Sequence, residues 1–198
     1  MVIAIDGPAG AGKSTVARAV AARLGFTYLD TGTMYRVVAL GALESGDPPA
    51  AVAERARIEL GDRVRLDGRD VSEAIRTPEI SAEASHVAGD QAVRDALVRR
   101  QQEILADGDW VAEGRDIALV VAPDAAVKVY LFADPAERAR RRSEEAGALH
   151  ARDVRDQTEG RSVLEPAPDA VPVDTTALSI DQVVDQIATL VVEAKELR

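Results

Sequence analysis

Near the N-terminus, residues 7–14 combine three glycines, a lysine and a hydroxyl side chain in the order GPAGAGKS. This order fits the pattern G-x-x-x-x-G-K-[ST], in which the glycines let the backbone curl so that its N–H groups point at phosphate oxygens. Lys13 can then reach the β- and γ-phosphates of a nucleotide, and the hydroxyl of Ser14 can bind Mg²⁺. The segment therefore predicts a nucleoside triphosphate site, formed by Gly7, Pro8, Ala9, Gly10, Ala11, Gly12, Lys13, Ser14 and Thr15.

A strand before this loop and a helix after it are needed to position these groups. Residues 2–5 are a short apolar run typical of a buried strand, and a helix is expected from Lys13, with Gly25 as its C-cap. The N-terminus of such a helix adds a positive dipole end to the phosphate site. Further strands are expected at 26–29, 110–112, 127–132 and 170–173, and helices near 34–36, at 135–142 and after the capping box of Ser179 and Gln182. This alternation predicts an α/β fold, a P-loop NTPase-type parallel sheet with helices on both faces.

The middle of the chain breaks this alternation. Pro48-Pro49 interrupts it, and two alternating runs around Asp67-Gly68 predict a small hairpin over residues 64–71. Two helices are expected at about 78–86 and 90–104. We therefore predict a core domain formed by residues 1–45 and 105–198, with an inserted domain at 46–104.

Composition narrows the possible partners. The net charge of −10 disfavours nucleic acid and anionic membranes as general partners. The chain contains no cysteine and only two histidines, which lie far apart, so neither a thiolate nor a histidine metal site is expected. The apolar run at 2–5 is too short for a signal peptide, and no stretch approaches a membrane span. These features predict a cytoplasmic protein, and nothing in the sequence demands more than a monomer.

The absence of asparagine removes one class of nucleotide-binding protein. Guanine recognition in GTPase switches uses an Asn-Lys-x-Asp motif, which this chain cannot contain. The remaining readings are a kinase for a nucleotide, a kinase for another small acceptor such as shikimate or gluconate, and a nucleotide-binding regulator without turnover.

Several further segments resemble the bacterial cytidylate kinases, in the order in which that family carries them. They run over nearly the whole chain: LDTGTMYR at 29–36, IRTPE at 75–79, Ser85, VRDALVRRQ at 93–101, AEGRD at 112–116, RDVRD at 152–156, DTT at 174–176 and LSI at 178–180. The resemblance implies phosphorylation of CMP and dCMP by ATP with Mg²⁺, and it makes the segment at 46–104 the monophosphate-binding domain. A lid is implied at about 143–162.

Residue roles also follow from this resemblance. Ser85, Arg94 and Asp116 would face the cytosine ring, Arg36 and Arg115 would hold the acceptor phosphate, Arg152 would bridge the phosphates, Asp156 would bind the ribose hydroxyls, and Thr31 and Arg76 complete the substrate set. The chemistry is consistent, because the acceptor phosphate is already ionised near neutral pH and needs no general base. Catalysis then requires positioning and charge neutralisation, by Lys13, Arg36, Arg115, Arg152 and Mg²⁺. Asp116 can accept from the amino group of cytosine and Arg94 can donate to its acceptors.

Simpler structural roles stand beside these assignments. The arginines at 94, 99 and 100 are typical of a solvated helix face, and those at 138–142 of surface charge, with an ATP contact as the alternative. Arg115 and Asp116 can form a plain surface ion pair. Asp30 is a second candidate for the Mg²⁺ site, or a helix N-cap.

The lid motif departs from the family pattern at one position. The family usually carries a further arginine three residues after the aspartate, where this chain has Glu159. Arg161 is a candidate replacement. The lid and the hairpin are also shorter than expected for the family.

Overall fold

The computed structural model describes residues 1–142 and 166–196. The chain divides into two compact units. The first comprises Met1–Leu29 and the described part of Ile104–Arg198, and the second comprises Asp30–Glu103.

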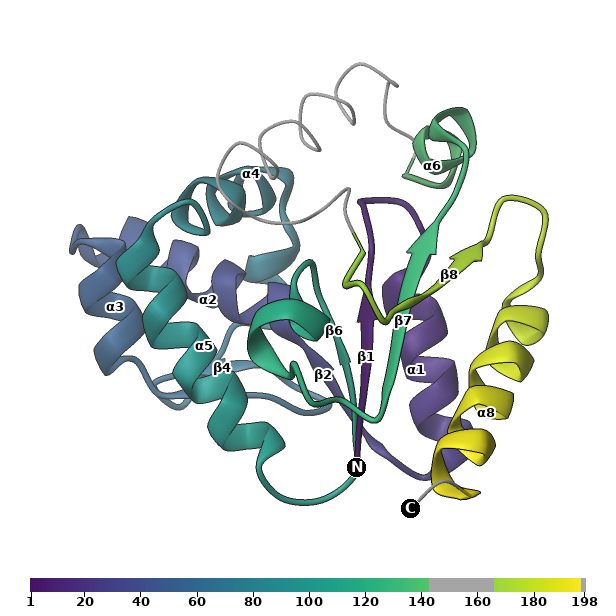
Figure 1. The fold of residues 1–198 in the computed structure, drawn as a ribbon. Helices are drawn as coiled ribbons and strands as arrows, with labels where there is room; N and C mark the ends of the chain where they lie inside the picture. The colour runs from purple at the N-terminus through teal and green to yellow at the C-terminus, as the bar shows by residue number, and fades with distance from the viewer. Residues whose placement is uncertain (143–165, 197–198) are drawn as a thin grey trace. The chain divides into compact units, whose positions relative to one another are not determined.

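The first unit is built on a five-stranded sheet (Figure 1). Its strands are β1 (Val2–Asp6), β2 (Thr27–Asp30), β6 (Trp110–Glu113), β7 (Val127–Phe132) and β8 (Val171–Asp174), in the order β2-β6-β1-β7-β8. The central strand β1 runs parallel to both β6 and β7, and β7 runs parallel to β8. The predicted parallel sheet is therefore confirmed, and the carboxyl ends of β1 and β6 lie at the same edge.

One face of this sheet packs against two helices. Figure 1 shows α1 (Lys13–Leu24) and α8 (Ile180–Glu196) side by side along it. Ile3 and Ile5 of β1, Leu131 of β7 and Ile187 of α8 are fully buried in the shared core. Truncating a buried Ile or Leu to Ala typically lowers the stability of a protein by about 2–5 kcal/mol. Because α1 contributes Val16 and Val20 to the same core, this packing fixes the helix that follows the loop.

The predicted helix ends in this unit are confirmed. Gly25 closes α1 in the left-handed conformation, with φ of 69°. Before α8, the hydroxyl of Ser179 accepts from the backbone N–H of Gln182, and the Gln182 side chain accepts from that of Ser179. The helix α6 (Pro135–Arg142) was also expected, but the short π-helical segment η2 (Ile117–Val121) was not.

The second unit is mainly helical. Its elements are α2 (Thr31–Ser45), α3 (Pro49–Arg55), η1 (Ala74–Arg76), α4 (Pro78–Val87) and α5 (Gln91–Leu105, which ends two residues beyond the unit), with the short strands β3 (Ile58–Glu59), β4 (Arg65–Leu66) and β5 (Arg69–Asp70). The helix α2 packs against α3 and α4. By contacts, α2 belongs to this unit, so the unit begins before the predicted limit at residue 46. That the segment at 46–104 is a monophosphate-binding domain remains a prediction.

Local turn chemistry explains what the sequence predicted correctly here and what it missed. Asp67 and Gly68 have φ of 50° and 83°, the left-handed pair that a two-residue hairpin requires, so the predicted hairpin of β4 and β5 is confirmed. The additional strand β3 pairs with β4. Pro49 was interpreted as a break, but it occupies the first turn of α3, where a missing N–H is harmless.

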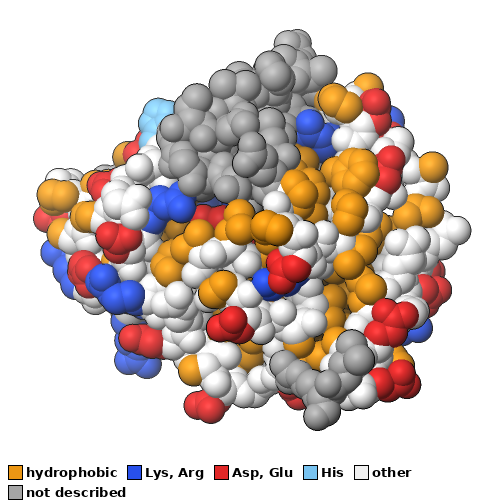
Figure 2. Space-filling view, in the orientation of Figure 1, with side chains coloured by type: hydrophobic (Ala, Val, Ile, Leu, Met, Phe, Trp, Pro, Cys, Tyr) orange, Lys and Arg blue, Asp and Glu red, His pale blue; other side chains and the backbone are white. Residues whose placement is uncertain are grey.

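The described surface carries charged side chains of both signs. Figure 2 shows acidic and basic side chains interspersed on the face that it draws. Among the described residues, no helix is both long and apolar enough to cross a membrane.

Candidate active site

The loop from Gly7 to Gly12 leaves the carboxyl end of β1 and turns directly into α1. Gly7 has φ of 146°, and a Cβ built there would lie 2.0 Å from the carbonyl oxygen of Leu131. Gly10 has φ of 78°, and its Cβ would meet the backbone and Cβ of Arg138 at 2.7–3.0 Å. Both positions therefore require glycine, because any side chain would be strained and would collide with backbone. The predicted strand–loop–helix setting of the phosphate motif is confirmed.

Side chains from other parts of the first unit hold the carbonyl oxygens of this loop. Four of the six residues from Gly7 to Gly12 have a carbonyl that accepts such a bond. The donors are Arg115 Nη1 to Gly7 at 2.8 Å, Lys13 Nζ to Pro8 at 2.9 Å, Arg138 Nη1 to Ala9 at 3.0 Å and Thr175 Oγ1 to Ala11 at 3.1 Å. The N–H of Ala11 donates to the Pro8 carbonyl at 3.4 Å, and the other N–H groups of the loop are the backbone donors that an anion could use.

A buried carboxylate lies beside the start of α1. Glu113, at the end of β6, accepts from the Ser14 hydroxyl at 2.5 Å and from the Tyr28 hydroxyl at 2.9 Å. Sequence reasoning assigned no role to Glu113. The available signal was its place directly after the strand expected at 110–112. Hydroxyl and carboxylate oxygens are ligands that Mg²⁺ accepts. Among the described residues, no cluster of three or more potential metal-ligating acidic or histidine side chains is present.

A second buried carboxylate, Asp6, lies directly before the loop. Its Oδ1 accepts from the N–H of Ile117 at 2.9 Å and its Oδ2 from that of Ala118 at 2.8 Å. Burial raises the pKa of Asp6 to about 6, even though these two N–H groups lower it; nearby Asp116 raises the pKa further and Lys13 lowers it. Sequence reasoning missed this residue too, because its partners are more than a hundred positions away.

The predicted acceptor-phosphate residue Arg115 is anchored to the loop. Its guanidinium is half-buried and donates to the Gly7 carbonyl, so Arg115 is tied to the phosphate loop and is more than a surface charge. Asp116 is also half-buried and immediately precedes η2.

Three arginines of α6 have described side chains, and their environments differ. Arg138 is buried against the loop, as described above. Arg141 donates to the hydroxyl and the carbonyl of Thr175 and to Glu137. Arg140 is mostly exposed and bonds Glu137, whose pKa the two arginines together lower to about 2. The expectation of plain surface charge is therefore wrong for Arg138, whereas Arg141 is exposed and also bonds Thr175.

In the second unit, Asp30 was expected to be either a Mg²⁺ ligand or a helix N-cap, and the structure shows the cap. Its carboxylate accepts from the N–H of Thr33 at 3.0 Å and from the Thr33 hydroxyl at 2.9 Å, which makes it the N-cap of α2. Thr31 and Arg36 lie on the same helix, Thr31 buried and Arg36 half-buried. Arg76 is exposed and donates to the Ser72 carbonyl.

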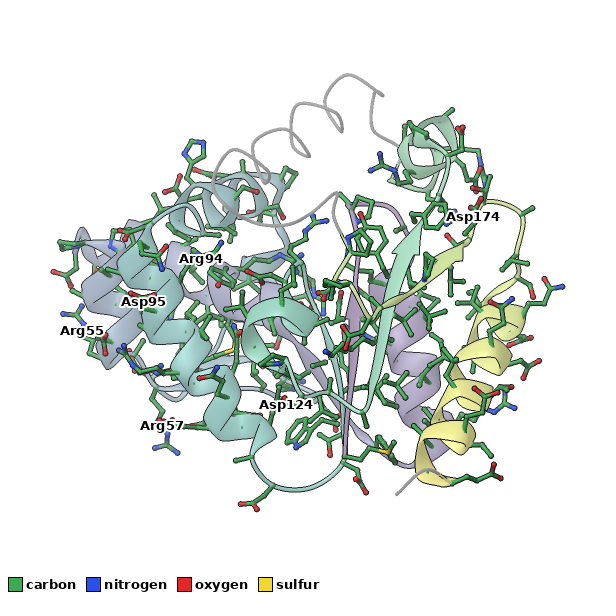
Figure 3. The ribbon with its side chains drawn as sticks, in the orientation of Figure 1. Arg55, Arg57, Arg94, Asp95, Asp124 and Asp174 are labelled. Carbon is green, nitrogen blue, oxygen red and sulfur yellow. The ribbon has the colours of Figure 1, made fainter. Side chains whose placement is uncertain are left out.

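The predicted cytosine-reading residues of this unit are buried. Ser85 on α4 is 5% exposed and Arg94 on α5 is 8% exposed. Figure 3 labels Arg94. The expectation of a solvated arginine face is thus wrong for Arg94. Arg99 is exposed and pairs with Glu54, while Arg100 donates to the carbonyls of Glu54 and Ala56.

The remaining predicted positions lie outside the described residues. They are Arg152, Asp156, the departure at Glu159, and Arg161, together with the predicted lid at about 143–162.

Known proteins resemble this chain over its whole length. A model of the cytidylate kinase family matches residues 3–193. The chain belongs to the cytidylate kinase family. A cytidylate kinase of Solibacter usitatus is 48% identical over 213 residues, covering 96% of this chain and 92% of the relative. One from Limosilactobacillus reuteri is 40% identical over 219 residues, covering 98% and 96%.

Membership of the cytidylate kinase family settles the enzyme class. The protein is a nucleoside monophosphate kinase, a transferase, and the reading as a regulator without turnover is set aside. A shikimate kinase of Acinetobacter baumannii, solved in complex with shikimate, has a similar structure, with a TM-score of 0.52, 15% identity, and coverage of 98% of this chain and 94% of that one. At that identity the likeness concerns the fold alone, which is that of P-loop kinases.

Proposed function

We propose that this enzyme transfers the terminal phosphoryl group of ATP to CMP and dCMP, in line between two bound nucleotides and with Mg²⁺. The observation that carries the proposal is the loop at Gly7–Gly12, whose carbonyls are bonded to Arg115, Lys13, Arg138 and Thr175. A loop held in this way offers its N–H groups and the N-terminus of α1 to the phosphates of ATP. The choice of CMP and dCMP as acceptors rests on membership of the cytidylate kinase family.

The chain also contains groups that fit Mg²⁺. The Ser14 hydroxyl and the Glu113 carboxylate lie within hydrogen-bond distance at the start of α1, and both offer oxygen atoms. These two residues would hold the ion, directly or through water. When bound, Mg²⁺ neutralises negative charge on the β- and γ-phosphates. Asp30 is a weaker candidate, because both of its oxygens already accept bonds from Thr33.

Charge neutralisation by side chains completes the proposed reaction. Lys13 and Arg115 bond carbonyls of the loop, which supports a role for Lys13 at the donor phosphates and for Arg115 at an acceptor phosphate next to them. Arg36 on α2 is assigned to the acceptor phosphate and Arg152 to the phosphate being transferred. Asp156 is assigned to the ribose. Because the acceptor oxygen is already ionised near neutral pH, none of these residues needs to remove a proton.

Burial supports the assignment of Arg94 to the base. Arg94 is 8% exposed and interacts with other groups of the chain, so its side chain is held within the unit rather than spread in solvent. A side chain held in this way can donate to the acceptors of cytosine, and Ser85 is buried in the same unit. Asp116 would accept from the amino group of cytosine, as carboxylates do when they read this base in nucleic acids.

A panel of acceptors tests the proposal. The full chain is incubated with ATP and Mg²⁺ and with CMP, dCMP, UMP, AMP or shikimate, and ADP and the phosphorylated product are separated by ion-exchange chromatography. We expect rapid formation of CDP and dCDP, little product from AMP or shikimate, and loss of activity when EDTA removes the metal. Equal rates with AMP, or the absence of CDP, would contradict the proposed function.

The lid arginines carry a separate test. Replacing Arg152 by alanine is expected to lower kcat for CMP by about a hundredfold, by analogy with the loss of other groups that stabilise charge in a transition state. If Arg161 replaces the arginine that Glu159 displaces, Arg161→Ala also lowers kcat. Wild-type kinetics for either variant would remove that residue from the reaction.

A further inference from the structure

Asp6 joins two segments that the sheet alone does not hold together. The strand β6 ends at Glu113, and the last backbone bond that continues its pairing runs from the N–H of Gly114 to the carbonyl of Ile5 at 3.1 Å. Beyond this point the chain turns away from the sheet and reaches η2 at Ile117. Arg115 and Asp116 lie within this turn and therefore need another support.

The support runs in both directions between residues 6–7 and residues 115–118. The carboxylate of Asp6 accepts from the backbone N–H groups of Ile117 and Ala118 at 2.9 and 2.8 Å. In return, Arg115 Nη1 donates to the carbonyl of Gly7 at 2.8 Å. These three bonds bracket Asp116 on both sides and tie it to the first residues of the phosphate loop.

A carboxylate is a demanding choice for this place. Asp6 is 5% exposed, and both oxygens are used by backbone donors, so an amide would bring its own N–H₂ group against one of them. Burial disfavours the charge, and the nearby carboxylate of Asp116 opposes it while Lys13 favours it. An apolar residue would fill the site without this conflict, so the carboxylate must be required for its two bonds.

We propose that Asp6 is a positioning residue whose carboxylate sets Arg115 and Asp116 against the phosphate loop, so that acceptor and donor nucleotides are aligned. This inference rests on the proposed function, because it takes Arg115 and Asp116 as contacts of the acceptor. Asp6 touches neither nucleotide in this role. Replacing Asp6 should therefore lower kcat/KM for CMP far more than it lowers the affinity for ATP.

The test compares Asp6→Asn and Asp6→Ser with the parent and with Asp67→Asn. Asp67 is a matched control, because its carboxylate also accepts a backbone N–H, that of Arg57 at 2.8 Å, but in the hairpin of the second unit. We expect kcat/KM for CMP to fall at least about tenfold in Asp6→Asn, which corresponds to about 1.4 kcal/mol. The Asp6→Ser variant brings no N–H₂ group against the backbone donors and should lose less. Binding of ATP alone, measured by calorimetry, should change by less than about threefold, and Asp67→Asn should match the parent.

A pH series supplies a readout that a purely structural role would not move. Protonation of Asp6 removes an acceptor, so parental kcat/KM for CMP should fall as the pH drops through about 6. Asp6→Asn cannot titrate there, so the ratio of parent to variant should decrease toward acid pH. Taking this ratio cancels the titration of the substrate phosphates. The charged groups that face Asp6 are Asp116 and Lys13, and both are present in parent and variant.

The outcomes separate the inference from the proposed function. A parent that forms no CDP overturns the proposed function itself. If the parent is active but both Asp6 variants use CMP normally, the positioning role is overturned. Equal losses of ATP binding and CMP use would also overturn it, because Asp6 would then merely hold the phosphate loop. The inference is supported if kcat/KM for CMP falls while ATP binding is kept, and if the ratio of parent to Asp6→Asn depends on pH.

Discussion

The phosphate loop and the predicted acceptor residues of the second unit differ in how far the folded chain already fixes them. In the loop, four carbonyls accept bonds from side chains of α1, α6 and the segments around residues 115 and 175. In the second unit, Arg76 makes a single exposed contact with the Ser72 carbonyl. Among the described residues, Arg36 forms no hydrogen bond or ion pair. The proposed donor site is thus preorganised by folding, whereas we expect Arg36 and Arg76 to complete their contacts only with the substrate. Changes in the loop should therefore affect kcat and KM for ATP. Changes in the second unit should affect kcat/KM for CMP.

Lys13→Met gives the largest expected effect. It removes the cation that bonds Pro8 at 2.9 Å and that would stabilise charge on the transferring phosphoryl group. We expect kcat to fall by about 10³-fold, as for other groups that stabilise transition-state charge. Steady-state formation of CDP measures it. The control is Lys195→Met, which removes an equal charge from α8, where Lys195 lies over the ring of Phe26. A comparable loss in the control would show that net charge, rather than position, matters.

Arg36→Ala tests the other side of the comparison. Because Arg36 is assigned to the acceptor phosphate, we expect kcat/KM for CMP to fall by about a hundredfold while KM for ATP changes by less than about threefold. The matched control is Arg69→Ala, which removes an exposed arginine paired with Glu44 in the same unit. An equal rise in KM for both nucleotides would mean that Arg36 serves the fold of its unit rather than the acceptor.

The same contrast explains how much could be predicted from the sequence. The loop, its flanking strand and helix, and the capping box at Ser179 depend on residues a few positions apart, so local patterns were sufficient. The five strands of the sheet followed from short apolar runs, and no strand end is shifted by more than one residue. The hairpin followed from Asp67-Gly68, because few residues adopt that pair of conformations.

What the sequence did not indicate depends on partners far along the chain. Asp6 and Glu113 are ordinary acidic residues until the parallel sheet brings β1 and β6 together, since their partners lie about a hundred positions away. Arg138 looked like surface charge because nothing in its own helix indicates that it faces the loop at Ala9. Arg94 was assigned to the base through the family resemblance, because nothing in its helix distinguishes it from Arg99, which is exposed.

Arg138→Met sharpens the comparison at the loop itself. It leaves the Ala9 carbonyl without its donor while keeping a long apolar side chain behind Gly10. Leaving a buried acceptor unsatisfied costs about 1–3 kcal/mol, so we expect KM for ATP to rise by about tenfold with little change in KM for CMP. Arg140→Met is the control on the same helix, because Arg140 is mostly exposed and bonds only Glu137 among the described residues. Equal effects of the two changes would assign the loss to α6 as a whole.

Thr175→Val should have the smallest effect, and it separates support of the loop from chemistry. The side chains are nearly isosteric, but valine cannot bond the Ala11 carbonyl at 3.1 Å or accept from Arg141 at 2.9 Å. Phe132 keeps a partner, because its carbonyl also accepts from the backbone N–H of Thr175. The unfolding free energy should fall by about 1–2 kcal/mol, or about 2–8 °C in Tm, with KM for ATP rising by less than about threefold. Thr189→Val on the exposed side of α8 should leave Tm within about 1 °C of the parent. A large loss of kcat without a change in Tm would instead place the Thr175 hydroxyl in contact with the nucleotide, and the donor site would then be less complete in the folded chain than its four bonded carbonyls imply.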